Sequence, residues 1–463
     1  MRTCFFLLPL LWMSLQATAQ QVTYFNRNQP IPQAQPVKVY EDELKPVQTL
    51  AEAGILDPYK LYKVDEFVND AVAKAAFPGC RVLVAKDGKV FYDKSFGYFN
   101  YDYKTPVNAK TVYDLASVTK VVSTTLVIMR LYEQGKLNLD MTLGDYLPMT
   151  LNTDKAGLRI RDLLLHQAGL KAWIPFYKSF LDSQGYQSPV AFSATRSGDY
   201  DIEVANSLYF RHDFRDTIWK MILASPLENK GRMVYSDLDY YFLAAVAEKI
   251  TSKTIDRLAT DQFYTPMGLR TIGYNPLQFL KKENIAPTEN DVTFRFQLLQ
   301  GYVHDPGAAL FGGVAGHAGV FGTAQDVAAI FQMLLNGGNY RGIRYFKKET
   351  IDMFTAYGSK ISRRGLGFDK PYADKNDGGP AGNRCSGYTF GHQGFTGTCV
   401  WADPATRVVF VFLSNRICPS QDNNLINKLS VRTIVQDRIY DALGIPQDNS
   451  RPEVQKLQLQ ATK

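Results

Sequence analysis

A serine stands three residues before a lysine in Tyr113-Asp114-Leu115-Ala116-Ser117-Val118-Thr119-Lys120, where a helix is expected to begin. Side chains at i and i+3 of a helix share one face, with Cβ atoms about 5–6 Å apart. The lysine can take the hydroxyl proton if burial or a nearby positive group lowers its pKa. The segment therefore predicts a nucleophilic Ser117 with Lys120 as its base. The alternative is a helix-capping serine beside a solvated lysine.

The residues after this serine follow a helical pattern. Apolar side chains recur at the spacing of one helix face, at Val121, Val122, Leu126, Met129 and Tyr132. Gly135 is a good C-terminal stop. The pattern predicts one helix over residues 118–134.

Elements farther from the serine set the fold class. Two strands, 80–85 and 89–96, are joined by Asp87-Gly88, a strong hairpin signal. Further helices are predicted over 160–166, 239–250, 324–335 and 431–443, and further strands over 390–395, 399–403 and 408–414. The order predicts an α+β sandwich, in which strands from both ends of the domain form one antiparallel sheet flanked by helices. A mainly helical subdomain is expected between them.

Length and composition limit the class of protein. The chain has 463 residues, of which 45% are hydrophobic and 21% charged, and a net charge of +7. These values are typical of a globular protein and exclude a disordered, collagenous or disulfide-scaffold chain. The mild basic excess is weak support for a nucleic-acid or membrane partner, so we expect a small-molecule or peptide substrate and no nucleic acid.

The N-terminus has the layout of a secretory signal peptide. A positive start at Arg2 precedes an apolar run over residues 4–15, and Ala17-Thr18-Ala19 is a small-x-small cleavage site. The apolar run is too short to span a bilayer, although an uncleaved anchor is the alternative. We expect a signal peptide over 1–19, export to the periplasm or beyond the cell, and no transmembrane segment after cleavage.

The rest of the chain is predicted to form one large domain with short additions. Residues 20–60 are polar and proline-spotted, which indicates an extended arm. The domain is expected over 61–445, with its insert at about 140–330, and residues 446–463 form a polar tail. Aromatic residues are frequent in 171–230, including Trp173, Phe176, Tyr177, Tyr186 and Tyr209. They either wall a substrate pocket or pack the subdomain.

Four cysteines remain after the predicted cleavage. An oxidising compartment permits disulfides, and four cysteines allow three complete pairings. They lack the close spacing of a zinc site, which favours buried free thiols or one disulfide over a metal site. The residues are Cys80, Cys385, Cys399 and Cys418.

Two further motifs could complete a site around the serine. A tyrosine hydroxyl beside a lysine can relay protons, and Tyr235 lies in Tyr235-Ser236-Asp237, before an apolar helix. An ordinary helix-entry turn is the alternative there. The second motif is Gly391-His392-Gln393-Gly394-Phe395, on a predicted strand. His392 can donate a hydrogen bond to a substrate, and Gly394 allows close approach of its backbone.

The three motifs, in this order, resemble those of the serine β-lactamase and penicillin-binding-protein superfamily. The chain is most similar to the class C β-lactamase-related branch, which includes D-aminopeptidases, DD-carboxypeptidases and esterases. The segment Ile160–Leu170 resembles the branch's "LLTHTSGL" stretch, and Gly312–Gly319 resembles a glycine-rich stretch in some members. The resemblance covers roughly residues 65–445.

The resemblance implies a role for each residue. Ser117 is the acylated nucleophile, Lys120 its general base, and Tyr235 helps to move protons. The backbone N–H groups of Ser117 and Phe395 form the oxyanion hole, in which each donor is worth about 3–4 kcal/mol. His392 lies on the side of the substrate carboxylate. No metal or organic cofactor is implied, and His166 and His317 are interpreted as structural.

Two departures from the family pattern bear on the substrate. His392 replaces the lysine of many relatives, and an unshifted histidine is only about a quarter charged at pH 7. Asp237 replaces an asparagine, and its carboxylate would raise the pKa of Lys120 and repel an anion unless Lys120 neutralises it. Both changes disfavour a true β-lactamase. They favour an esterase, amidase or peptidase acting on a less anionic substrate, with a peptidoglycan-derived peptide still allowed.

The function predicted from the sequence is an exported serine hydrolase that works through an acyl-enzyme on an ester, amide or D-amino-acid substrate. An alternative from another class is a non-catalytic penicillin-recognising module, either a sensor or a binding partner. The presence of Ser117, Lys120 and Tyr235 together favours the enzyme. The oligomeric state is not predicted.

Overall fold

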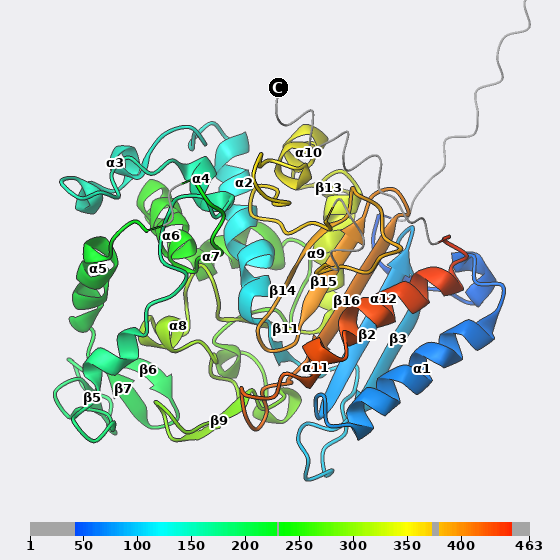
Figure 1. The fold of residues 1–463 in the computed structure, drawn as a ribbon, viewed down its shortest axis with the longest axis horizontal. Helices are drawn as coiled ribbons and strands as arrows, with labels where there is room; N and C mark the ends of the chain where they lie inside the picture. Colours follow the sequence, from blue (N-terminus) through cyan, green and yellow to red (C-terminus); the bar gives the residue numbers. More distant parts are fainter. Residues whose placement is uncertain (1–41, 229–230, 373–378, 447–463) are drawn as a thin grey trace, which may run out of the picture. The chain divides into compact units, whose positions relative to one another are not determined.

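The computed structural model describes residues 42–228, 231–372 and 379–446 (Figure 1). The predicted signal peptide, the first part of the predicted arm and the tail from residue 447 lie outside these ranges, so the domain boundaries stay predictions. Within residues 42–60, β1 (Lys45–Pro46) pairs with the edge of the main sheet, and α1 (Pro58–Ala73) begins after the N-cap Asp57. No helix in the described ranges is long and apolar enough to cross a membrane.

A six-stranded sheet forms the framework of the domain. Its order is β1-β3-β2-β16-β15-β14, and all neighbours are antiparallel except the short pair β1–β3. The remaining strands are β2 Gly79–Lys86, β3 Lys89–Gly97, β14 Phe390–Gln393, β15 Cys399–Asp403 and β16 Val408–Ser414. Because β2 pairs with β16, the sheet joins both ends of the domain, which confirms the predicted fold class.

Both faces of this sheet are buried. Successive side chains of a strand point to opposite faces, so Val82 and Val84 join one core while Leu83 and Ala85 join the other. The first core contains residues of α1 and of α12 (Val431–Ala442), and the second contains α9 (Ala324–Leu335). Figure 1 shows α1 and α12 on one face and α9 on the other.

The β2–β3 hairpin turns as predicted. Asp87 and Gly88 both have positive φ, at 54° and 81°, which a two-residue type I′ turn requires. The predicted helix at 324–335 matches α9, and the predicted strands from 390 onward match β14, β15 and β16 to within two residues.

The middle of the chain holds helices and four small sheets. The helices are α2 Thr125–Glu133, α3 Leu143–Tyr146, α4 Ile160–Leu164, α5 Phe214–Ala224, α6 Leu238–Thr251, α7 Ile255–Ala259, α8 Pro306–Leu310 and α10 Lys348–Thr355, followed near the C-terminus by α11 Leu425–Lys428. The small sheets are β5-β7-β6 (Phe192–Ser193, Leu208–Phe210, Ile202–Ala205), β10-β9 (Gln297–Leu299, Glu289–Asp291), β4-β11-β8 (Tyr113–Asp114, Val320–Gly322, Gly273–Tyr274) and β12-β13 (Asn339–Tyr340, Ile343–Arg344). The insert thus contains strands as well as the expected helices.

All four cysteines are buried, and Cys80, Cys399 and Cys418 are free thiols. Two of them, Cys80 and Cys399, lie on the strands β2 and β15 of the main sheet. Of the two alternatives left open by their spacing, the structure agrees with buried thiols and not with one disulfide.

Candidate active site

Ser117 is presented by a turn and not by a continuous helix. Strand β4 pairs with β11 and ends at Asp114, whose carboxylate accepts the backbone N–H of Ala116 at 2.9 Å. Ala116 has a φ of 46°, a conformation that is uncommon outside glycine and often occurs at functional sites. Ser117 follows in a 3₁₀ turn over Ala116–Val118.

Lys120 opens a π-helical turn, Lys120–Thr124, which leads into α2. The predicted single helix over 118–134 is therefore divided into three types of turn. Insertions of π-helix are rare and occur frequently at functional sites. The combined turns place both Ser117 and Lys120 against the N-terminal end of α6.

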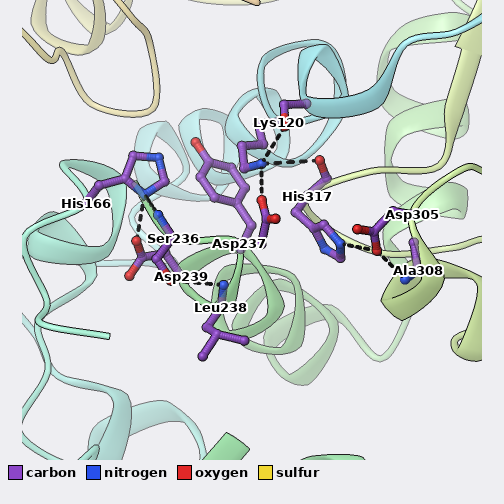
Figure 2. A network of polar contacts seen from close by, with 12 residues as sticks. Lys120, His166, Ser236, Asp237, Leu238, Asp239, Asp305, Ala308 and His317 are labelled. Atoms are coloured by element: carbon purple, nitrogen blue, oxygen red, sulfur yellow. Dashed lines mark hydrogen bonds and ion pairs between the residues drawn. The ribbon is translucent and has the colours of Figure 1, made fainter. Parts of the chain in front are cut away.

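Lys120 is fully buried, and its ammonium lies at the centre of the polar contacts in Figure 2. Its Nζ lies 3.0 Å from the Ser117 Oγ, 2.6 Å from Asp237 Oδ1 and 3.4 Å from the backbone oxygen of His317. The sequence predicted the first contact from the i, i+3 spacing. The second brings together residues 117 positions apart.

The charge state of Lys120 differs from what a simple base requires. Burial lowers the pKa of Lys120, but the Asp237 carboxylate and Tyr235 raise it further, so that it lies above its usual value. The lysine is thus protonated at neutral pH. The condition that the pKa of Lys120 be lowered is not met in this state of the site, and Asp237 is a cause, as its charge suggested.

Tyr235 lies directly beside the lysine. Its ring centroid is 4.7 Å from Lys120 Nζ. Its buried hydroxyl interacts with the side chains of Lys120 and Ser117 but makes no close hydrogen bond to any of the described residues. Burial raises the pKa of Tyr235, against the effect of Lys120. The neutral hydroxyl is therefore free to donate a proton or a hydrogen bond to a bound substrate.

A buried neutral pair supports this tyrosine from behind. His166 Nδ1 lies 2.6 Å from Asp239 Oδ2, and the His166 and Tyr235 rings are 4.6 Å apart. Burial lowers the pKa of His166 and raises that of Asp239. Because Nδ1 also accepts the N–H of Ser236, the shared proton belongs to Asp239. The contacts fit the structural interpretation of His166.

His392 has no nitrogen left for a substrate. Its Nδ1 donates to the backbone oxygen of Gln393 at 2.7 Å, and its Nε2 accepts from Arg364 at 3.2 Å. Burial, Arg364 and Lys120 together lower the pKa of His392 to about 3. The ring is neutral at physiological pH, in place of the quarter charge expected for an unshifted histidine.

Arginines supply the positive charge at this end of the site. Arg363 makes a bidentate pair with Asp369, at 2.8 and 3.0 Å, and Arg364 lies 3.5 Å from the same carboxylate. Two guanidinium groups thus share one aspartate. Sequence reasoning missed both arginines, because they belong to no motif and reach the site only through the fold of the loop after α10.

Gly394 brings the end of β14 against the turn that carries the serine. A Cβ there would lie 2.5 Å from the Leu115 oxygen and 2.1 Å from Thr398 Oγ1, so only glycine fits. The next residue is Phe395. In the described part of the chain, neither its N–H nor that of Ser117 donates a hydrogen bond to the protein. Both N–H groups remain available as the predicted oxyanion donors.

A cavity of about 850 Å³ opens over these groups. Its lining includes Ser117, Tyr235, Asp237 and Phe395, with Arg295, Arg363, Arg364, Arg416 and Arg432 around them. Trp173, 44% exposed, and Tyr177 line the cavity, whereas Phe176 belongs to the core. The aromatic residues of 171–230 therefore both line the cavity and pack the core.

A family model described as Beta-lactamase matches residues 64–431. The chain belongs to the β-lactamase family. Among curated proteins, one from Escherichia coli K12 that carries the provisional name of a D-alanyl-D-alanine carboxypeptidase is 32% identical over 420 residues, covering 83% of this chain and 91% of the relative. An N-acetylmuramyl-L-alanine amidase of Bacillus subtilis 168 is 32% identical over 393 residues, covering 79% and 83%.

Solved structures of the family share the fold. The octameric penicillin-binding protein homologue from Pyrococcus abyssi has a TM-score of 0.60 at 18% identity, covering 86% of this chain and 80% of its own. EstCE1, a hydrolase with promiscuous acyltransferase activity, has a TM-score of 0.59 at 20% identity, covering 82% and 98%. Family and relatives together make this protein a hydrolase with the serine β-lactamase fold.

One group in the described part of this β-lactamase-family chain has the residue types of a metal site. Ligand atoms of Asp237, Asp305 and His317 lie within 4.8 Å of one another. Asp237 already binds the Lys120 ammonium, and Asp305 binds His317 Nε2 at 2.8 Å. These carboxylates are therefore paired within the protein.

Proposed function

We propose that this protein is an exported serine hydrolase that forms an acyl-enzyme on Ser117, with Lys120 as the group that removes the hydroxyl proton. The 3.0 Å contact between Lys120 Nζ and Ser117 Oγ, at the wall of the cavity, carries this proposal. Export rests on the signal-peptide pattern of residues 1–19.

The proposed reaction has two halves. Ser117 Oγ attacks the substrate carbonyl, and the N–H groups of Ser117 and Phe395 stabilise the negative charge on its oxygen. The Tyr235 hydroxyl passes a proton to the leaving group, and the acyl chain stays on the serine. Water then takes the place of the leaving group and hydrolyses the ester by the same steps in reverse.

Two arginines of the cavity offer positive charge to an anionic group of a substrate. The expectation of a less anionic substrate rested on His392 and Asp237, but Lys120 neutralises Asp237. The lining holds six carboxylates and five arginines, and Arg295, Arg363 and Arg364 are paired with carboxylates of that lining. Arg416 and Arg432 make no ion pair with a carboxylate of the described residues. We therefore propose a D-amino-acid peptide of the cell wall that carries a carboxylate, a class consistent with the names of the curated relatives.

The test is covalent labelling followed by intact-protein mass measurement. A fluorophosphonate or an activated ester should add one acyl or phosphonyl mass at Ser117, and Ser117→Ala should lose both the adduct and the hydrolysis of p-nitrophenyl acetate. Ser183→Ala, which changes an exposed loop serine, is the matched control and should keep both. A protein with no adduct would support the non-catalytic binding module, and activity in Ser117→Ala would place the nucleophile elsewhere.

A further inference from the structure

We propose that Asp237 is a proton acceptor in catalysis: Lys120 passes a proton to Asp237 before it takes the hydroxyl proton of Ser117. The proposal rests on the acyl-enzyme function above and assigns the residue that frees the lysine. It differs from the substrate-binding role that the motif implies for this position.

The hydrogen-bond count at the lysine requires such an acceptor. A protonated lysine has three N–H donors and no acceptor. Lys120 has three oxygen neighbours, one on each of Ser117, Asp237 and His317, so all three of its donors are in use. It cannot accept the serine proton until it has given one away.

Only one of the three neighbours can take that proton. The His317 partner is a backbone carbonyl and the Ser117 partner is the hydroxyl to be activated, neither of which is a base at neutral pH. Asp237 is a carboxylate, and its contact of 2.6 Å is the shortest of the three. Bulk water has no direct access, because the lysine side chain is fully buried.

The surroundings of the pair act on its charged and neutral forms in opposite directions. Burial penalises charge separation, and transfer of one proton turns an ammonium and a carboxylate into a neutral amine and acid. The aromatic rings of Tyr235 and Tyr240, 4.7 and 5.4 Å from Nζ, favour the ammonium. Arg364 and neutral His392 face the site from one side, and the pairs His166–Asp239 and His317–Asp305 from the others. The resting pair is therefore charged, and the neutral pair is a transient form on the way to acylation.

The proton balance closes over one turnover. The Lys120 ammonium first gives a proton to Asp237. The neutral amine then takes the Ser117 proton as the Oγ–C bond forms and the carbonyl electron pair moves to oxygen. When the C–N or C–O bond to the leaving group breaks, that group receives a proton through Tyr235, and Lys120 resupplies the tyrosine. The acid form of Asp237 then returns its proton to Lys120.

Asp237→Asn separates this role from two others. Asparagine keeps the size and one acceptor oxygen but cannot hold the proton. In the wild type Asp237 receives the lysine proton directly, at a contact of 2.6 Å, so activation of Ser117 needs no exchange of that proton with solvent. In the variant the lysine must lose its proton to solvent, so activity should rise only as pH approaches the pKa of the isolated amine.

The experiment measures kcat/KM for p-nitrophenyl acetate, and the labelling rate of Ser117, from pH 5 to 10. For Asp237→Asn we expect kcat/KM to fall by about 10²-fold at pH 6 and to recover at alkaline pH. The pH at which kcat/KM declines on the acid side should be higher than in the wild type by about one pH unit or more. Asp305→Asn removes the same charge from the same cavity without touching Lys120, and its acid limb should stay where the wild type has it. Acetate or formate should partly rescue Asp237→Gly, because Asp237 is 19% exposed toward the cavity.

Three outcomes would overturn the relay. If the acid side of the kcat/KM profile is the same in Asp237→Asn as in the wild type, Asp237 has only a positioning role. If Asp237→Asn is faster than the wild type at pH 6, Asp237 only holds Lys120 in its charged form. An equal shift in Asp305→Asn would indicate a general effect of charge. A wild-type protein that gives no adduct at Ser117 refutes the proposed function itself, whereas a normal adduct with an unshifted Asp237→Asn profile refutes only the relay.

Discussion

The proposed proton-moving role of Tyr235 comes at some cost to stability. Its hydroxyl is buried and makes no close hydrogen bond to any of the described residues, and such a group costs about 1–3 kcal/mol when left unpaired. The ring is nevertheless held between Lys120 and His166. A hydroxyl that contributes nothing to the folded state is expected to act on the substrate.

Tyr235→Phe should therefore lose activity without losing stability. We expect kcat to fall by about 10²-fold or more because the proton path to the leaving group is removed. The free energy of unfolding, measured with urea, should stay the same or rise by about 1 kcal/mol.

Tyr240→Phe is the matched control, since Tyr240 lies on α6, five residues after Tyr235, and its hydroxyl lies 3.1 Å from Thr125 Oγ1. It should lose about 1 kcal/mol of stability and keep more of the activity. Equal kinetic losses in both variants would count against a proton-moving role for Tyr235.

At this scale the motif residues could be predicted and their charge states could not. Ser117, Lys120, Tyr235, Asp237 and Gly394 were recognisable because spacing and residue type carry the signal. The structure brings four of them to the lining of one cavity, and Lys120 lies buried behind Ser117 and Asp237. Protonation depends on contacts made by the folded chain. The Arg364 contact that keeps His392 neutral comes from a loop with no sequence signature, so it was missed.

At the scale of elements, the turn at residues 114–118 and the end of β14 hold each other in register. Thr398 Oγ1 donates to the Leu115 oxygen, and Thr396 Oγ1 donates to the Asp114 oxygen. Arg416 and Arg432 fix the same loop by donating to the oxygens of Phe395 and Thr398. The distance between the two proposed oxyanion donors, the N–H groups of Ser117 and Phe395, therefore depends on tight packing of the backbone.

Gly394→Ala tests this packing. The added methyl would meet two atoms at 2.5 Å or less, so the strand end must move away from the serine. We expect a loss of about 10²–10³-fold in kcat, the effect of losing one oxyanion donor, while binding of substrate changes less.

Gly157→Ala provides the control, because a Cβ there has open space around it and should leave kcat unchanged. Full activity in Gly394→Ala would mean that the Phe395 N–H has no part in the oxyanion hole.

Apolar periodicity predicted the central strands of the main sheet and the helices α6, α9 and α12, and the failures elsewhere have physical causes. The helix after Ser117 was predicted as regular because periodicity does not detect a positive φ at Ala116 or a π-helical turn. The two- to four-residue strands of the insert are too short for an alternating pattern. By contrast α9 is buried at every position except Gln325 and β16 is wholly buried, and the apolar runs of both are clear in the sequence.

For the whole molecule, the sheet explains why so much chain is needed for a small site. Ser117 follows the N-terminal hairpin, Tyr235 enters α6 of the insert, and Gly394 ends a C-terminal strand. The pairing of β2 with β16 brings the first and last of these segments together. Titratable groups are buried where these three segments meet, so we expect the free energy of unfolding of the domain to depend on pH.

His392 links the site to the pH dependence of folding. Its pKa is about 3 in the folded protein and about 6.5 in the unfolded chain. Above pH 6.5 neither state binds a proton and stability is complete. Between pH 6.5 and 3 the unfolded state alone is protonated, so the free energy of unfolding falls by about 1.4 kcal/mol per pH unit.

Urea unfolding from pH 8 to 4 should show this slope as a difference between the wild type and His392→Gln, which has no such proton to bind. Parallel curves for the two proteins would mean that His392 titrates normally in the folded state, and the neutral bridge to Arg364 would be wrong.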